Sequence, residues 1–303
     1  MVQPNSPPSR CYGQKVLVIV GLAVVVVSVI GGFLLAGGNV LLLLQWAEFM
    51  IIGGASLGAL LISTPMPTLK KIIAYILKSF KSSGHTQANF VEMLQLLYEL
   101  FQTARVKGLL HLESHVEKPQ ESELFAKYPI VHNNHHALEY ITDSLKLLVV
   151  GGVPALELEL ILDADLETQE EEGRKPSLIL AKIGDSMPGL GIVAAVLGIV
   201  ITMQSIGGPA SEVGHHVAAA LVGTFLGVLM CYGFVSPLSS TIENQAAAEE
   251  VFLKSIKAGV VAYAKGMAPI VAVEFARRVI TTDLRPSFGE VEEACRAIKV
   301  KGN

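Results

Sequence analysis

The chain alternates between strongly apolar stretches and polar regions of mixed charge. Two apolar stretches, residues 16–69 and 183–253, contain no Lys or Arg. A helix of about 20 apolar residues, rising about 1.5 Å per residue, crosses the hydrocarbon core of a bilayer, so each stretch can cross it twice. The segments that meet this requirement are Val16–Ala36, Val40–Ser63, Ile183–Ile206 and Val213–Val235. The pattern predicts an all-α integral membrane protein with four transmembrane helices in two hairpins.

The polar regions predict further helices outside the membrane. Apolar and aromatic residues recur at helical spacing from Leu69 to about Leu112, which predicts one amphipathic helix there. More helices are expected at about 136–150, 154–172 and 239–265. Turn signals stand at Lys118–Pro119, Gly151–Gly152 and Gly173–Pro176. Strand signals are nearly absent, so the region between the hairpins is predicted to be a helical domain.

Basic residues near the span ends predict the orientation of the chain. Lys and Arg collect at the cytoplasmic ends of spans. Here they precede the first span and follow the second, whereas the links at 37–39 and about 203–212 carry none. Both termini and the central region are therefore expected in the cytoplasm. The predicted parts are an N-terminal extension (1–15), transmembrane hairpin 1 (16–63), a cytoplasmic helical domain (64–182), transmembrane hairpin 2 (183–236) and a cytoplasmic helical tail (237–303).

Composition agrees with a membrane protein that has a substantial cytosolic part. The chain is 51% hydrophobic and 17% charged, with a mean hydropathy of +0.52. A net charge of −4 without a basic stripe argues against nucleic-acid binding. No nucleophile, metal or phosphate-loop pattern indicates a soluble enzyme. The three cysteines are isolated in the sequence, so no disulfide framework is expected.

The third and fourth spans each carry one face of small residues. Gly191 and Gly198 lie on this face of span three, and Gly223 and Gly227 lie on that of span four. Such faces allow helix backbones to approach closely in lipid. Two interpretations are open: the two helices pack on each other, or together they form a seat for a helix of another protein.

Few ionisable residues lie within the spans. Moving an ion through a bilayer usually requires such a side chain at depth. Asp185 stands at the cytoplasmic entrance of span three and Glu48 in the outer half of span two. Neither position suits a sole carrier at the membrane midplane. If the chain takes part in ion movement, the carboxylate that captures the ion is expected on a partner.

Several strings along the chain carry a resemblance to known proteins: Ala47–Phe49, Ile51–Ala55, Gly184–Val196, Val222–Gly227, Tyr232–Leu238, Ala272–Arg277 and Arg285–Phe288. In the same order, they resemble strings of the MotA family of flagellar stator subunits, within the MotA/TolQ/ExbB proton channel superfamily. The resemblance runs from about residue 15 nearly to the end of the chain. The first ten residues look like an extension beyond the usual start, and Trp46 stands where many relatives have proline.

The resemblance implies a non-enzymatic subunit of a proton-conducting complex in the bacterial inner membrane. MotA-like chains form a homo-oligomeric ring around paired single-span MotB subunits, and MotB supplies the membrane aspartate that binds the ion. Ion flow then produces torque on the rotor protein FliG for swimming. The resemblance implies no bound cofactor, because the proton is transported, and its partners are MotB, FliG, further copies of the chain and lipid.

Charged positions of the family match Arg105, Glu113 and, more weakly, Asp165. The resemblance implies that they face the rotor. Arg105 and Glu113 are eight residues apart with Gly108 between them, so we expect them beside one helix end or on a loop just beyond it. The alternative is that all three are ordinary solvated surface charges.

Two prolines and two small side chains match positions of the ion path. Pro188 and Pro237 match the family's functional prolines, and the alternative is that each marks a helix boundary. Ala195 stands where sodium-driven relatives carry threonine. Because a methyl group cannot coordinate sodium, a proton is the predicted ion. Thr224 could offer its hydroxyl to the path or bond to a carbonyl one turn earlier.

Other features leave two further interpretations. The ExbB and TolQ energisers share the ring plan but use three spans, and a stand-alone transporter would carry its own midplane site; four spans and the lack of a midplane acid favour the stator. His132, His135 and His136 lie close together in sequence, but no second matching ligand group accompanies them, so no metal site is predicted.

Overall fold

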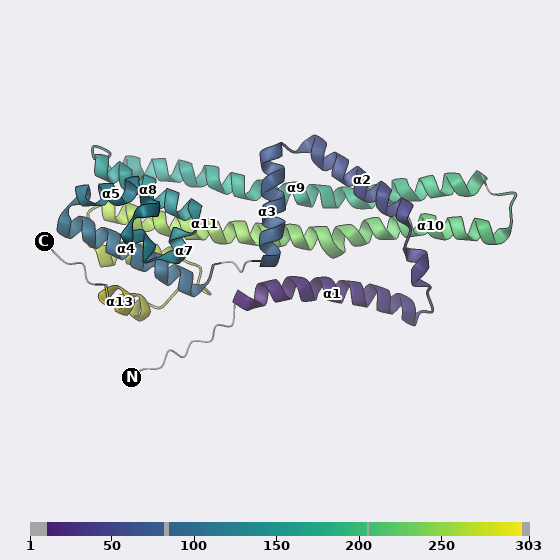
Figure 1. Ribbon diagram of the computed structural model, residues 1–303, viewed down its shortest axis with the longest axis horizontal. Coiled ribbons are helices and arrows are strands. Elements are labelled where there is room, and N and C mark those ends of the chain that lie inside the picture. The colour runs from purple at the N-terminus through teal and green to yellow at the C-terminus, as the bar shows by residue number, and fades with distance from the viewer. Residues whose placement is uncertain (1–10, 82–84, 205, 299–303) are drawn as a thin grey trace. The chain divides into compact units, whose positions relative to one another are not determined.

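The computed structural model describes residues 11–81, 85–204 and 206–298, and within these ranges the ordered elements are helical, with no strand (Figure 1). The prediction of an all-α chain is confirmed. The chain divides into two compact units, Met1–Ser83 with Glu172–Gln245, and Gly84–Glu171 with Ala246–Asn303. We call them unit 1 and unit 2. The predicted N-terminal extension falls mostly outside the described residues.

Unit 1 contains both apolar hairpins. Its elements are α1 (Cys11–Leu35), the 3-10 turn η1 (Val40–Leu43), α2 (Trp46–Ser63), α3 (Met66–Lys81), α10 (Ala210–Leu229) and the π-helical stretch η4 (Met230–Val235). Two long helices, α9 (Ala155–Gln204) and α11 (Ser236–Ala264), contribute residues to both units. Four helical segments among the described residues are long and apolar enough to cross a membrane, as predicted.

Local sequence explains where the first hairpin turns. Gly37 has a φ of +80°, a conformation that favours glycine, and it follows the end of α1. The Asn39 side chain accepts a hydrogen bond from the Leu41 N–H (3.0 Å) and caps η1. At the other end of the hairpin, α2 stops at Ser63, directly before Thr64 and Pro65. Proline disfavours a helical conformation at the preceding residue, which accounts for this end.

Unit 2 is built around α4 (Gln87–Lys107), whose apolar face is buried. The elements around α4 are η2 (Leu109–Leu112), α5 (Glu113–Glu117), η3 (Pro119–Glu121), α6 (Glu123–Ala126), α7 (Pro129–His132), α8 (His135–Val150), α12 (Pro269–Val279) and α13 (Phe288–Arg296). Phe101 of α4 stacks on Tyr263 of α11 with ring centroids 4.6 Å apart. Phe90 packs against Phe252 at 5.3 Å. These aromatic contacts tie α4 to α11.

Two predictions about helix boundaries are wrong. The single helix expected from Leu69 to Leu112 is instead α3 and α4, because Thr86 starts a new helix by capping the N–H of Asn89 (3.2 Å). The turn expected at Gly173–Pro176 does not form, and α9 continues through it. Pro176 is buried, and the Ser239 hydroxyl donates to the Ser177 carbonyl (2.7 Å). Packing of this kind can override a local turn signal.

Candidate functional site

The small-residue faces of α9 and α10 meet within the chain and form what we call the glycine seam, made of Gly191, Gly198, Gly223 and Gly227. Figure 1 shows α10 alongside the later part of α9. A Cβ placed on Gly191 would lie 2.8 Å from the Gly223 carbonyl oxygen, and one on Gly227 would lie 2.5 Å from the Met187 carbonyl oxygen. A Cβ on Gly198 would lie 2.9 Å from that of Ala220. The seam therefore brings two helix backbones into direct contact.

Two residues predicted to line the ion path, Ala195 and Thr224, lie beside the contact between α9 and α10. Each directly follows a residue that is buried in that contact. Ala194 is fully buried, and its Cβ lies 3.2 Å from a Cβ placed on Gly223. Ala195 and Thr224 are both half-buried. The structure thus places them on neighbouring turns of the paired helices, at the border between the seam and the outside of the chain.

Pro188 lies in the interior of α9, so it is not a helix start. A proline has no N–H, and the carbonyl one turn earlier, that of Gly184, loses its usual partner. Gly184 packs against the end of η4, since a Cβ there would lie 2.9 Å from Val235 Cγ1. Pro237 follows two residues later, in the first turn of α11. The sequence did not predict that the irregular backbone near Pro188 and that near Pro237 lie close together along the two paired helices.

The π-helical stretch η4 adds a second irregularity at this level. Its C-cap N–H, that of Ser236, donates to the Cys231 carbonyl. Downstream, the Thr241 hydroxyl donates to the Pro237 carbonyl (3.0 Å). Single π turns inside helices are often found at functional sites. The fourth span therefore departs from regular α-helical hydrogen bonding near the level at which α9 carries its own proline.

The three charged residues predicted to face a rotor all lie in unit 2 and are exposed. Arg105 is in the last turn of α4, and Glu113 opens α5. Gly108, with a φ of +87°, ends α4 between them. Within the described part of the chain, neither Arg105 nor Glu113 forms an ion pair or hydrogen bond through its side chain. Asp165 on α9 accepts a hydrogen bond from Gln169 Nε2 (3.1 Å).

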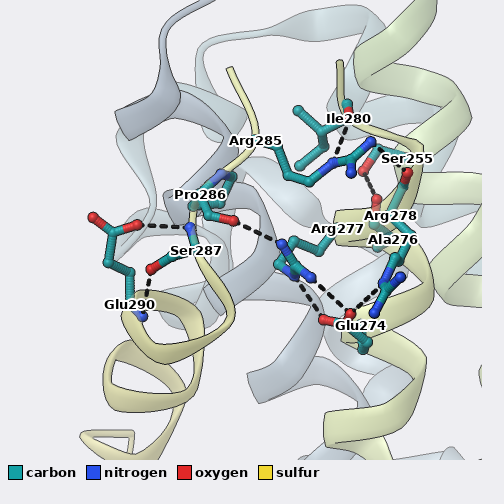
Figure 2. Close-up of polar contacts among 10 residues, drawn as sticks. All are labelled: Ser255, Glu274, Ala276, Arg277, Arg278, Ile280, Arg285, Pro286, Ser287 and Glu290. Carbon is teal, nitrogen blue, oxygen red and sulfur yellow. Dashed lines mark hydrogen bonds and ion pairs between the residues drawn. The ribbon is translucent and has the colours of Figure 1, made fainter. Parts of the chain in front are cut away.

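A charged cluster in α12 explains two of the matching strings (Figure 2). Arg277 is 8% exposed and donates to both oxygens of Glu274, at 2.6 and 2.8 Å, and to the Pro286 carbonyl at 2.9 Å. Arg278 donates to the same carboxylate at 2.7 Å. The hydrogen bond from Arg277 lowers the pKa of Glu274, against a smaller opposing effect of burial. The cluster is structural: it fastens α12 to the segment before α13.

The histidine and cysteine side chains of the described residues are possible metal ligands. Among the described residues no group of three or more ligating side chains comes together. Cys231 and Cys295 are buried free thiols, and burial raises the pKa of Cys295 to about 12. His85, which sequence reasoning did not single out, lies 2.7 Å from Glu249 through Nε2 and stacks on Phe252 at 4.3 Å. Cys231 contributes to packing in unit 1, and Cys295 and His85 contribute to packing in unit 2.

Comparison with known proteins shows which proteins this chain is similar to. Residues 19–108 match the family described as motility protein A N-terminal, and residues 132–254 match the MotA/TolQ/ExbB proton channel family. The chain is 39% identical to motility protein A of Salmonella typhimurium over 93% of this chain and 96% of that protein. Its fold is similar to the C. jejuni MotAB structure (TM-score 0.73, 21% identity, covering 88% of this chain and 96% of that one). It is also similar to the flagellar MotAB stator complex of Bacillus subtilis (TM-score 0.67, 24% identity, 84% and 92%).

Proposed function

Because this chain belongs to the motility protein A family of MotA/TolQ/ExbB proton channels, we propose that it is the larger subunit of a flagellar stator that converts ion flow into torque for swimming. The similarity to motility protein A along nearly the whole chain carries this proposal. Family membership also assigns a non-enzymatic role and a multi-pass location in the bacterial inner membrane. Both termini are proposed to lie in the cytoplasm, as the positions of Lys and Arg suggest.

The proposed partner is a MotB-type single-span subunit. Two structures similar in fold are of MotAB complexes, which supports this choice. The sequence also supports it, because no acidic residue lies between Pro188 and Gln204 or between Val213 and Val235, whereas an ion path needs a group that binds the ion. In the proposed assembly, several copies of this chain surround paired partner helices and supply the walls of the path.

The partner helix is proposed to pack beside the glycine seam, against the outer faces of α9 and α10. Gly191, Gly223 and Gly227 are themselves buried within the chain, and the close approach of the two backbones that they allow holds these outer faces in place. Ala195 and Thr224, at the border of the seam, would then face the ion. Pro188 and Pro237 are proposed to couple release of the ion to movement of the helices, because each leaves a carbonyl without its helical partner.

The proposed rotor contact lies on unit 2, at Arg105, Glu113 and Asp165, and the rotor partner is FliG. Arg105 and Glu113 have no side-chain partner among the described residues, so both charges are available to pair with another protein. Charge complementarity at an interface steers encounter and sets register more than it adds affinity. Such a contact suits a machine that must bind and release its rotor in every step.

A test of the proposal uses a motile bacterium that lacks its own larger stator subunit. The chain is expressed there together with its single-span partner, and swimming, co-purification in detergent and the number of copies in images of the complex are measured. We expect swimming, co-purification and several copies of this chain around the partner. Failure to co-purify with any single-span protein that bears a membrane aspartate would contradict the proposal.

A further inference from the structure

Glu48 has an unusual environment for a carboxylate in a membrane helix. It lies in the first turn of α2 and is 5% exposed within this single chain. Ile52 and Ser56, four and eight residues further, are each 3% exposed, so the three side chains form one buried stripe along α2. The other residues of α2 are more exposed, as expected of a helix with lipid on most sides. The acid therefore points into the protein and not toward lipid.

The carboxyl group of Glu48 reaches the place where α2, α9 and α10 meet. Its Oε2 lies 2.5 Å, and its Cδ 3.2 Å, from the position that a Cβ on Gly223 would take. The Cβ of Ala194 on α9 lies 3.2 Å from the same position. With any side chain at position 223, the carboxyl group of Glu48 would have to move from its present place. The glycine seam thus has a polar group inserted from a third helix at its centre.

No charged side chain among the described residues compensates this carboxylate. Glu48 Oε2 has no hydrogen-bond partner among the described residues, and neither has Ser56 Oγ. The remaining residues of α2 and those of η1 are not titratable, and on α9 the nearest such residue is Asp185, far along the helix.

The titratable side chains of α10 and η4 also lie away from Gly223. They are Glu212, His215, His216, Cys231 and Tyr232. The closest on α10, His216, is seven residues from Gly223, or about 10 Å along the axis.

We propose that Glu48 is a proton-binding site of this chain, near the N-terminal end of α2, and that it serves as a second station for the proton that the proposed stator conducts. The inference rests on the proposed function. A carboxylate buried without a partner is costly, and binding a proton from hydronium to give a neutral carboxyl and water lowers that cost. A metal cation would need several oxygen ligands, whereas Gly223 and Ala194 offer none from their side chains. Ser56, which can both donate and accept, is the next polar group on the buried stripe.

The test compares Glu48→Gln, which keeps the shape but cannot bind a proton, with Glu48→Asp, which keeps the titrating group in a shorter side chain. Glu212→Gln is the matched control, because Glu212 is an exposed acid on α10. Each is expressed with the partner, and rotation speed is measured over a series of external pH values together with the amount of co-purified partner. We expect Glu48→Gln to slow rotation at least about tenfold at every pH with unchanged co-purification. Glu48→Asp should retain more speed than Glu48→Gln, and Glu212→Gln should match the wild type.

Wild-type speed of Glu48→Gln across the pH series would overturn the proposal. So would a Glu48→Asp variant as slow as or slower than Glu48→Gln, since a packing role depends on length and shape rather than on titration. If Glu48→Gln lowers co-purification, the comparison of its rotation speed with that of Glu48→Asp still decides whether Glu48 acts by binding a proton.

Infrared difference spectra of the purified complex separate this inference from the proposed function. The wild-type complex should show the band of a protonated carboxyl group, and the Glu48→Gln complex should lack it. This band is expected whether or not the complex turns a motor, and its absence from the wild type would overturn the proposal.

Discussion

Arg105 is an exposed charge that forms no pair within the described part of its own chain, and Glu113 shares this property. An interaction with the rotor would therefore depend on the sign of each charge and not on packing. We expect Arg105→Glu to leave the amount of protein in the membrane unchanged and to reduce swimming severely. A rotor with the opposing charge reversed should restore swimming.

The matched control for that experiment is Lys118→Glu, which reverses another exposed basic residue of unit 2 that already has a nearby acid, Glu121 at 3.7 Å. It should swim like the wild type. Unaffected swimming of Arg105→Glu, or an equal loss with Lys118→Glu, would remove the rotor-contact proposal.

Glu274 supplies a prediction about pH. Hydrogen bonds from Arg277 lower its pKa in the folded chain below the ordinary value of 4.5. The unfolded chain therefore binds a proton more readily than the folded chain does, and the stabilisation is present above pH 4.5 and is lost as the pH falls through the lowered pKa. We expect the melting temperature of Glu274→Gln to lie below that of the wild type at pH 7. The gap should narrow as the solution is acidified below pH 4.5; a gap that stays constant would contradict this account.

Single residues were the hardest part to interpret from sequence. The proposed roles of Arg105 and Pro188 rest only on family resemblance, since a lone charge or proline has an ordinary interpretation that fits equally well. Glu48 was visible as an acid in a span, but its burial depends on Gly223, 175 positions later in the chain. No local pattern reports such a contact.

At the scale of elements, the packing at the glycine seam predicts that alanine substitutions at two glycines of α10 change thermal stability differently. A Cβ on Gly227 would lie 2.5 Å from the Met187 carbonyl oxygen and 3.0 Å from Gly191 Cα, whereas one on Gly214 would meet nothing within 4 Å. Gly227→Ala must separate two backbones, at a cost of about 1–3 kcal/mol that exceeds the gain of about 1 kcal/mol from better helix propensity. In detergent, we expect the melting temperature of Gly227→Ala to be lower than that of the wild type. That of Gly214→Ala should be equal to the wild-type value or higher. Equal melting of the two variants would show that the seam is not tightly packed.

The proline in the membrane part of α9 leads to a prediction about motion. In Pro188→Ala the N–H of residue 188 can donate to the Gly184 carbonyl, so the helix becomes more regular and stiffer. We expect unchanged or higher thermal stability, normal co-purification with the partner and slower rotation. Pro176→Ala makes the same chemical change in the same helix outside the predicted span and should rotate normally. Loss of assembly in Pro188→Ala would mean that the proline only shapes the helix.

Helices could be predicted where the sequence pattern is long. The predictions failed where tertiary contacts determine whether a helix ends or continues. Each predicted span is an apolar segment of 20 or more residues, and the structure has four such segments. The break between α3 and α4 depends on Thr86 and the uninterrupted course of α9 on the burial of Pro176. Both local signals were present, but one was missed and the other was overridden by packing.

At the scale of the whole molecule, the division into an apolar unit 1 and a unit 2 with its own aromatic core follows from the distribution of charge along the chain. Fold class could therefore be predicted from sequence alone. The assembly could not be, because the number of copies and the position of the partner depend on surfaces that a single chain leaves exposed. The number of copies and the position of the partner are therefore parts of the proposed function.

The choice of ion is a property of the whole complex and yields the last prediction. Ala195 presents only a methyl group to the proposed path and Thr224 a single hydroxyl oxygen, whereas sodium would need several oxygen ligands there in place of its water shell. A proton needs only titrating groups and water. Each charge that crosses about 100 mV releases about 2.3 kcal/mol, so torque should follow the proton gradient directly. Replacing external sodium by potassium at fixed pH should leave rotation speed unchanged, and a protonophore should stop the motor. Arrest in potassium would instead assign the coupling ion to sodium and would require oxygen ligands from the partner.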